Sequence, residues 1–220
     1  MIIFGSEILT NLLHLIAESL LIPVILILIG FFTFAILSLG SCVTEKFSRV
    51  RFDVDKTENL IRAISKSSSP EEMKEHVRSS DLNVKLKNVL IKIINNQDIG
   101  VESRKALANK LIEDLELQYA NITQKTDILV RLGPTMGLMG TLIPLGPGLA
   151  ALGNGDISAL AQALTISFDT TITGLAAGAM GFIISRYRKK WYMDDLSILE
   201  AIVTSTLEAL ERCQKRKEDF

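Results

Sequence analysis

Three long stretches of this sequence are almost free of charged residues. None occurs in residues 19–44 or 132–155, and residues 157–185 contain only Asp169. The stretches hold 26, 24 and 29 residues, and a helix needs about 20 apolar residues to cross a bilayer. A chain of 220 residues offers too little other protein to bury three such helices. The sequence therefore predicts an all-α integral membrane protein with three transmembrane helices.

The segment before the first span has a polar and an apolar side. Glu7, Asn11, His14 and Glu18 repeat at intervals of four, three and four residues, and leucines occupy the other side. This pattern is typical of an amphipathic helix that lies in the membrane interface, and we expect one over residues 1–18. A secretory signal peptide would begin with basic residues and have a shorter apolar run, so we expect the first span to be retained.

Basic residues near the ends of the spans predict their orientation. They follow span one, precede span two and follow span three: Lys46, Arg49, Arg51, Lys125, Arg131, Arg186, Arg188, Lys189 and Lys190. The positive-inside rule makes this side cytoplasmic. We therefore expect a multi-pass protein of the cytoplasmic membrane with its N-terminus outside, a cytoplasmic loop over residues 45–131 and a cytoplasmic C-terminal helix over residues 186–220.

The cytoplasmic segments have helical patterns. Ser69-Pro70-Glu71-Glu72 has the form of a capping box with proline at the first helical position, which predicts a helix start at Pro70. No proline or glycine occurs from Val101 to Leu132, and none follows Gly181. We therefore expect spans two and three to continue as long helices into a cytoplasmic helical bundle.

Small residues recur along one face of the second span and one face of the third. They are spaced by three and four residues within each span: Gly133, Gly137, Gly140, Gly174 and Gly178. Such faces allow close helix packing in membranes. Pro144 and Pro147 cannot donate to the carbonyls of Gly140 and Ile143, which leaves these carbonyls free to bind a partner or line a path, or marks only a packing kink.

Polar residues of the third span fall on a second face. Asp169 lies near the middle of the span, where a charge costs about 2.5–3.5 kcal/mol on insertion scales. Thr165 and Thr173 share its stripe, whereas Thr171 lies about 200° away around the helix. We interpret Asp169, Thr165, Thr173 and the neighbouring Thr170 as tuning or inter-subunit residues. The alternative for Asp169 is a neutral aspartate that only holds helices together.

The sequence lacks the motifs of several functional classes. The two cysteines, Cys42 and Cys213, have no spacing to histidine that suggests a metal site. No glycine-rich loop followed by lysine and a hydroxyl residue is present, so no nucleotide site is expected. We expect neither an enzyme nor a cofactor, a metal or a nucleic-acid partner.

Two motifs resemble those of the MotA/TolQ/ExbB proton channel family. Span two contains Gly133-Pro-Thr-Met-Gly137-Leu-Met-Gly140-Thr141-Leu, and span three contains Ala163-Leu164 followed by Thr170-Thr171-Ile-Thr-Gly174-Leu175. The resemblance implies a proton-channel subunit of an ion-gradient-driven motor. It also implies a homopentamer that surrounds the transmembrane helices of a single-span partner of the ExbD, TolR or MotB type.

The resemblance also implies roles for individual residues. In the family the essential aspartate belongs to the partner, and threonines of spans two and three line the ion path beside it. By motif these threonines are Thr141 and Thr171. The acidic residue that ExbB and TolQ often carry early in the third span corresponds to Ile166, and the proline pair in span two is unusual.

Two rival functions follow from the residues alone. A non-conducting helical membrane scaffold would recruit a partner and would use intramembrane polar residues only to join helices. A small-solute transporter would be expected to show an internal inverted repeat, and three spans show none.

Overall fold

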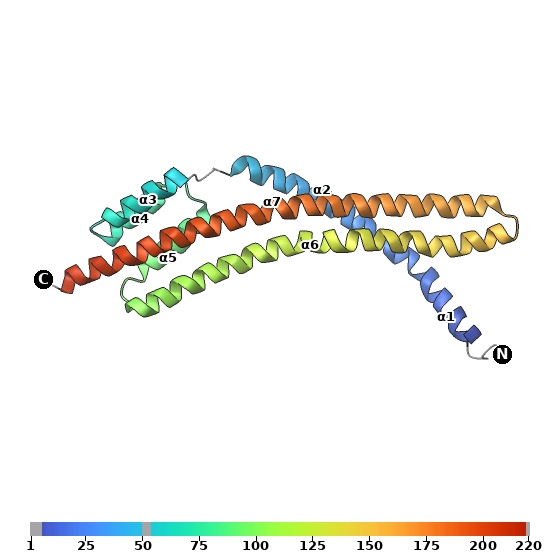
Figure 1. Cartoon of the computed structure of the whole chain (residues 1–220), viewed down its shortest axis with the longest axis horizontal. Helices are drawn as coiled ribbons and strands as arrows, with labels where there is room; N and C mark the ends of the chain where they lie inside the picture. Colours follow the sequence, from blue (N-terminus) through green and yellow to red (C-terminus); the bar gives the residue numbers. More distant parts are fainter. Residues whose placement is uncertain (1–5, 50–53, 219–220) are drawn as a thin grey trace. The chain divides into compact units, whose positions relative to one another are not determined.

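The structure, a computed structural model, describes residues 6–49 and 54–218. Figure 1 shows the helices of this part of the chain: α1 Ser6–Ser19, α2 Leu21–Ser48, α3 Val54–Lys66, α4 Pro70–Ser79, α5 Val84–Asn95, α6 Val101–Gly153 and α7 Ile157–Glu218. Within these described residues, three stretches are long and apolar enough to cross a membrane, namely Glu7–Ser48, Val101–Gly153 and Ile157–Arg216. The predicted all-α class with three membrane-length helices is thus confirmed.

Some expected features fall outside the described residues. These are residues 1–5 of the expected interfacial helix, Arg51 of the basic set, and residues 219–220 at the end of the expected C-terminal helix. Within the described part, only Leu20 separates α1 from α2. Helix α2 continues to Ser48, four residues beyond the end expected for the first span.

The chain divides into two compact units. The membrane unit comprises Met1–Val43 and Thr123–Tyr187, and the polar unit comprises Thr44–Ile122 and Arg188–Phe220. Helices α6 and α7 contribute to both units because each is long, with 53 and 62 residues. The expectation that spans two and three continue into long helices without a break is confirmed.

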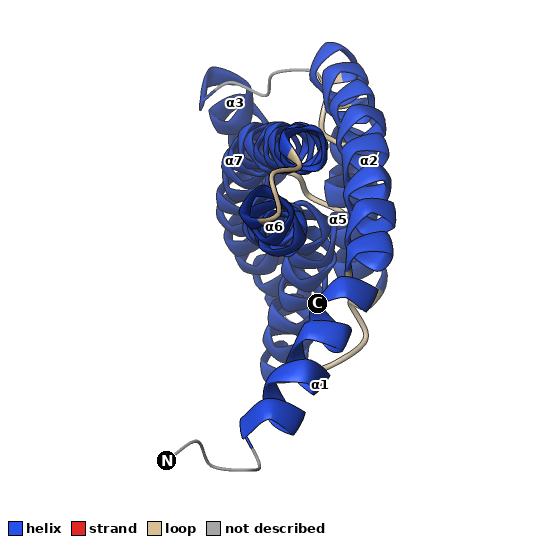
Figure 2. Ribbon diagram, turned by 90° about the vertical axis from the view of Figure 1, so that its right-hand side faces the viewer, coloured by secondary structure: helices blue, strands red, loops and turns tan. Residues whose placement is uncertain are grey.

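Helices α6 and α7 form an antiparallel hairpin in the membrane unit, with their ends joined by a short turn (Figure 1) and with both helices visible end-on in Figure 2. The Asp156 N–H donates to the Ala151 carbonyl and the Gly155 N–H to that of Leu152, which is the pattern of a Schellman cap. Gly155 has φ +83°, a conformation that glycine adopts at little cost. The Asp156 carboxylate then accepts from the Ala159 N–H and caps the start of α7.

The membrane unit has a small core and an apolar surface. Ala35 of α2 packs with Leu129 of α6 and Ala177 of α7, and Phe31 and Met180 border them. Many large apolar side chains of these helices are exposed in the single chain. Water would penalise such a surface, whereas lipid or a neighbouring membrane helix would not.

The polar unit has a larger core, formed by α3, α4, α5 and the adjoining parts of α6 and α7. The predicted start of α4 is confirmed, since Ser69 caps the helix and its hydroxyl accepts from the Glu72 N–H. The Glu72 carboxylate accepts from the Ser68 N–H, one residue before the position of an ideal capping box. The chain also breaks between α4 and α5, where the Asn83 side chain accepts from the Lys85 N–H.

Candidate functional site

Glycines form the contact between α6 and α7 in the membrane unit. A Cβ atom placed on Gly174 would lie 2.5 Å from the carbonyl oxygen of Gly133 and 2.8 Å from the Cα of Gly137. Both neighbours are backbone atoms, so the two helices touch through their main chains. We call this contact the glycine seam; Gly133, Gly137, Gly140, Gly174 and Gly178 all lie in it.

The ends of the glycine seam are filled by larger residues. A Cβ on Gly178 would lie 2.9 Å from the Pro134 Cδ, and one on Gly140 would lie 2.6 Å from the Thr170 Cβ. Thr170 is only 7% exposed, and its hydroxyl donates to the backbone carbonyls of Ile166 and Ser167. Thr170 is therefore buried between α6 and α7, unlike Asp169, Thr165 and Thr173, with which the sequence analysis grouped it.

Thr141 and Thr171 lie at the edge of the seam, and both are partly exposed. The Thr141 hydroxyl donates to the Leu138 carbonyl at 2.6 Å, and the Thr171 hydroxyl donates to the Ser167 carbonyl at 2.9 Å. The Ser167 hydroxyl donates across the seam to the Thr141 carbonyl at 3.0 Å. Ser167 thus links the two helices at the level of both threonines.

The hydrogen bonds of Thr141 and Thr171 determine what their hydroxyls can offer. A hydroxyl has one proton and two lone pairs, and in both residues the proton is directed to a carbonyl of the same helix. The exposed side of each oxygen therefore presents lone pairs. Such a surface accepts hydrogen bonds from hydronium, water or a protonated carboxyl group, and it disfavours anions.

The stripe of Asp169 lies on the outer side of the hairpin. Asp169 and Thr165 are exposed, and Thr173 is partly exposed. The hydroxyls of Thr165 and Thr173 donate to the backbone carbonyls of Ala161 and Asp169, at 3.0 and 2.7 Å. Their protons are therefore not directed at the Asp169 carboxyl group, which faces outward at mid-span.

A second polar contact joins α6 and α7 nearer the polar unit. The Ser185 hydroxyl donates to the Asp127 carboxylate at 2.5 Å, and Ser185 is 4% exposed. Thr126, one residue before Asp127, is also buried and donates to the Thr123 carbonyl. This contact lies 18 residues along α7 from Ser167, far from the two threonines at the seam edge.

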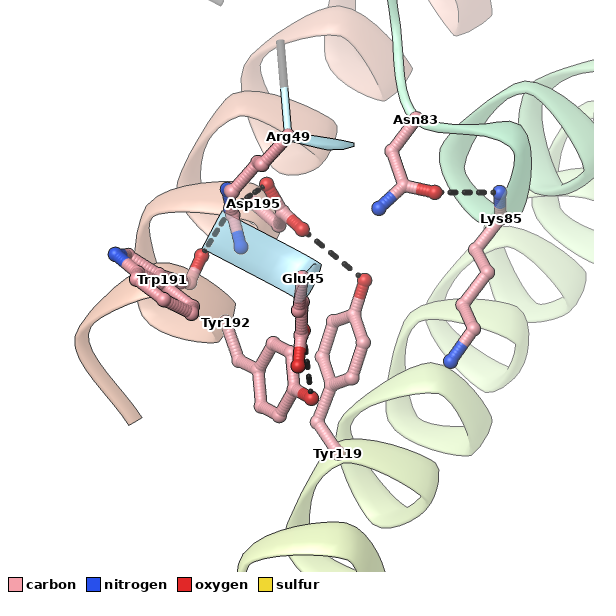
Figure 3. Close-up of polar contacts among 8 residues, drawn as sticks. All are labelled: Glu45, Arg49, Asn83, Lys85, Tyr119, Trp191, Tyr192 and Asp195. Carbon is pink, nitrogen blue, oxygen red and sulfur yellow. Dashed lines mark hydrogen bonds and ion pairs between the residues drawn. The ribbon is translucent and has the colours of Figure 1, made fainter. Parts of the chain in front are cut away.

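Another group of polar residues lies in the polar unit, and Figure 3 shows its members other than Arg188. We call it the tyrosine cluster; it consists of Glu45, Arg49, Tyr119, Arg188, Tyr192 and Asp195. The rings of Tyr119 and Tyr192 stack with centroids 4.1 Å apart. The Tyr119 hydroxyl donates to Asp195 at 3.2 Å, and the Tyr192 hydroxyl donates to Glu45 at 3.1 Å.

Each acid of the tyrosine cluster also pairs with an arginine. The Arg188 Nε donates to Glu45 at 3.0 Å, and Arg49 pairs with Asp195 and donates to the Trp191 carbonyl at 2.7 Å. The cluster therefore joins the end of α2 to α7 through two ion pairs. In one pair α7 provides the arginine, and in the other it provides the acid. Because every charge has a partner, its arrangement is suited to holding helices together.

Burial dominates the electrostatics of the tyrosine cluster, which lies outside the three expected spans. Loss of hydration, followed by the nearby Glu45 carboxylate, raises the pKa of Tyr192 to about 12. The same two causes, with Asp195 as the carboxylate, raise the pKa of Tyr119. Burial also raises the pKa of Asp195, although Arg49 opposes this effect. Both tyrosines therefore remain neutral donors at neutral pH.

The sequence analysis did not identify Ser167 as a site residue, and it missed the tyrosine cluster. The spacing of Glu45 and Arg49, and of Arg188, Tyr192 and Asp195, places each set on one helix face. That spacing is the signal that could have suggested the cluster. Within the described residues, no three His, Cys, Asp or Glu side chains are grouped to hold a metal ion.

A comparison with known families agrees with the motifs of the two spans. The model of the MotA/TolQ/ExbB proton channel family matches residues 83–201, which is more than half of the chain. This range includes the whole glycine seam, Thr141 and Thr171. No curated protein matches the sequence. The resemblance that the motifs indicated is confirmed.

Proposed function

The chain belongs to the MotA/TolQ/ExbB proton channel family, and we propose that it is the channel subunit of an ion-gradient-driven, energy-transducing motor complex. In this proposal, five copies surround the transmembrane helices of a single-span partner of the ExbD, TolR or MotB type, which supplies an intramembrane aspartate. Thr141 and Thr171 line the ion path beside that aspartate. Proton flow then moves the pentamer relative to its partner.

The observation that carries this proposal is that Thr141 and Thr171 lie beside the glycine seam and are linked through Ser167. Both are partly exposed, and both present hydroxyl oxygens whose protons are already bonded to their own helix. A protonated carboxyl group can donate to such an oxygen, whereas an ionised carboxylate cannot. The threonines would therefore favour a partner aspartate that carries a proton across the membrane.

Oligomerisation would provide the rest of the path. One hairpin of α6 and α7 has no enclosed channel along its seam, because the two backbones touch there. Neighbouring copies are needed to enclose a path beside the exposed hydroxyls. We further propose that Asp169, which is exposed at mid-span, faces an adjacent copy and tunes the path, because lipid would penalise an aspartate at that depth.

The orientation follows from charge. Basic residues flank the ends of the spans that adjoin the polar unit, and in the described part these include Lys46, Lys125 and Arg186. We therefore propose that the polar unit is cytoplasmic and that the turn between α6 and α7 lies outside. Protons would enter near this turn and leave on the side of the polar unit.

The test uses the complex purified from its own membranes and reconstituted into vesicles. Thr171→Val removes one acceptor oxygen while keeping the shape of the side chain, and we expect proton flux to fall about tenfold, as for loss of a hydrogen bond worth about 1.4 kcal/mol. Asp169→Asn should abolish partner-dependent work in cells while the oligomer still assembles. Thr33→Val in α2 is the matched control, because the Thr33 hydroxyl also bonds its own helix, at the Ile29 carbonyl.

Normal flux and normal work in both the Thr171→Val and Asp169→Asn complexes would show that the assigned ion path is wrong. A purified complex that contains no single-span partner would also contradict the proposal. Mass measurement of the intact complex provides the stoichiometry in the same preparation.

A scaffold function is the second candidate, and the extensive core of the polar unit favours it. A scaffold would recruit a partner through that unit without conducting ions. Under this alternative, Thr141→Val and Thr171→Val would leave the cellular activity intact. Substitutions that unfold the polar unit would abolish it.

A further inference from the structure

Ser167 occupies a central position between the two threonines of the proposed path. It lies on α7 one turn before Thr171 and faces α6, where it is only 2% exposed. Its hydroxyl oxygen is 3.0 Å from the carbonyl oxygen of Thr141. Its own carbonyl accepts the hydroxyl of Thr171 at 2.9 Å and that of Thr170 at 3.0 Å.

The hydroxyl of Ser167 differs from the other hydroxyls at this depth in the direction of its bond. Those of Thr141, Thr165 and Thr171 each donate to a carbonyl three or four residues earlier in the same helix. Such local bonds satisfy a hydroxyl in an apolar environment without fixing a neighbouring helix. Ser167 instead donates to α6, so its bond constrains how α6 and α7 are placed along their length.

This constraint acts at the level of Thr141 and Thr171, the two threonines of the proposed path. The glycine seam allows close approach, and the side chains of Pro134 and Thr170 pack against Gly178 and Gly140. This packing is not a directional bond between the helices, because the Thr170 hydroxyl donates to carbonyls of its own helix. A directional bond between Ser167 and the Thr141 backbone opposes sliding of one helix along the other. A shift along the seam would change the separation of the Thr141 and Thr171 oxygens, which line the proposed path.

We propose that Ser167 is a positioning residue of the ion path, which holds the hydroxyls of Thr141 and Thr171 at a fixed separation. It acts through the two threonines and does not itself contact the ion. The inference rests on the proposed function, since it assigns Ser167 a role at the same path.

The variant Ser167→Ala separates the role of the Ser167 hydroxyl from that of its backbone carbonyl. It removes the hydroxyl that bonds Thr141 but keeps the backbone carbonyl that Thr171 and Thr170 use. In the reconstituted complex, with an imposed pH gradient and a pH-sensitive dye inside the vesicles, we expect proton flux to fall about threefold. This factor corresponds to the average strength of a side-chain hydrogen bond between membrane helices.

Ser185→Ala provides the matched control. Ser185 is a buried serine of the same helix whose hydroxyl also crosses to α6, where it bonds Asp127. It lies 18 residues from Ser167 and is no part of the proposed path. Removal of its hydroxyl should lower the thermal stability of the complex at least as much as Ser167→Ala does, but it should leave the proton flux per folded complex unchanged.

The comparison has outcomes that overturn the inference. Equal loss of flux in Ser167→Ala and Ser185→Ala would show that Ser167 only stabilises the hairpin. Unchanged flux in Ser167→Ala, in a complex where Thr171→Val loses flux, would refute the positioning role alone. Normal flux in Thr171→Val would refute the place of Thr171 in the ion path, and with it the role of Ser167, which acts through that threonine.

Discussion

Substitution of Gly174 by alanine tests the packing of α6 against α7. The added Cβ would lie 2.5 Å from the Gly133 carbonyl oxygen, and also close to the Cα and nitrogen of Gly137, at 2.8 and 3.0 Å. Ordinary contact begins at 3.4 Å. All three neighbours are backbone atoms, so no side chain can rotate away. The two helices would have to separate locally by about 0.9 Å.

The expected cost follows from two opposing effects. Overpacking of a tight interior costs about 1–3 kcal/mol, and a contact with backbone falls toward the upper end of this range. A gap of about 0.5–1 Å also forfeits a quarter to a half of each dispersion contact along the seam. Alanine recovers up to about 1 kcal/mol through its higher helix propensity. We therefore expect Gly174→Ala to lower the free energy of unfolding by about 1–2 kcal/mol.

Unfolding in mixed micelles with increasing dodecyl sulfate, followed by the fluorescence of the single tryptophan and by circular dichroism, measures this change. The control is Gly30→Ala in α2, because a Cβ at Gly30 would have no neighbour within 4 Å. That variant should unfold at the same detergent fraction as the unmodified protein or a slightly higher one. If Gly174→Ala were as stable as Gly30→Ala, the backbone contact at the seam would be refuted.

Three further substitutions test the polar unit. Ser69→Ala removes the cap of α4, which costs about 1 kcal/mol, and should speed amide hydrogen exchange in the first turn of the helix about fivefold. Ser68→Ala is the control and should not change this exchange, because the variant keeps the backbone N–H that bonds Glu72. Since the folded pKa of Tyr192 is raised to about 12, the unfolded chain loses that proton first, so stability should fall as pH rises from about 10 to 12. Tyr192→Phe should remove part of this loss of stability at high pH. In an absorbance titration of the unmodified protein, some tyrosines should ionise at a higher pH than in the unfolded chain. Arg49→Met leaves the Asp195 carboxylate buried without its cation and should cost about 3–5 kcal/mol at neutral pH in the same unfolding assay. This cost should shrink as pH falls, because protonation of Asp195 removes the buried charge, and a cost that does not vary with pH would refute the pairing.

The helical framework could be predicted largely from the sequence because its signals are local. Span length follows from the absence of charge, and the continuity of α6 and α7 follows from the absence of helix breakers. The start of α4 at Pro70 follows from a capping motif of four residues. The break between α4 and α5 was missed because it contains no proline or glycine. Its signal is the capping residue Asn83, which is weak by itself.

The candidate site was less predictable because it depends on which residue faces a neighbouring helix. Thr170 and Thr171 are adjacent in sequence, yet Thr170 is buried against Gly140 and Thr171 lies at the seam edge. From the sequence, Thr170 was grouped with Asp169 as a tuning or inter-subunit residue. The sequence assigned no role to Ser167, because the bond that distinguishes it runs from its hydroxyl to the carbonyl of Thr141, which is 26 residues away in the chain.

The sequence by itself determined that this is an all-α membrane protein with three stretches long and apolar enough to cross a bilayer. It also determined that the second and third stretches continue as long helices and that small residues line both. These properties depend on composition and on the helical period, which any segment carries without reference to its neighbours. Only the tertiary structure decided that Gly133 and Gly174 bring two backbones together, that Ser167 joins the helices, and that stacked tyrosines bind two acids in the polar unit. Those contacts join residues distant in the chain, and their geometry depends on how each helix is rotated about its own axis against the next.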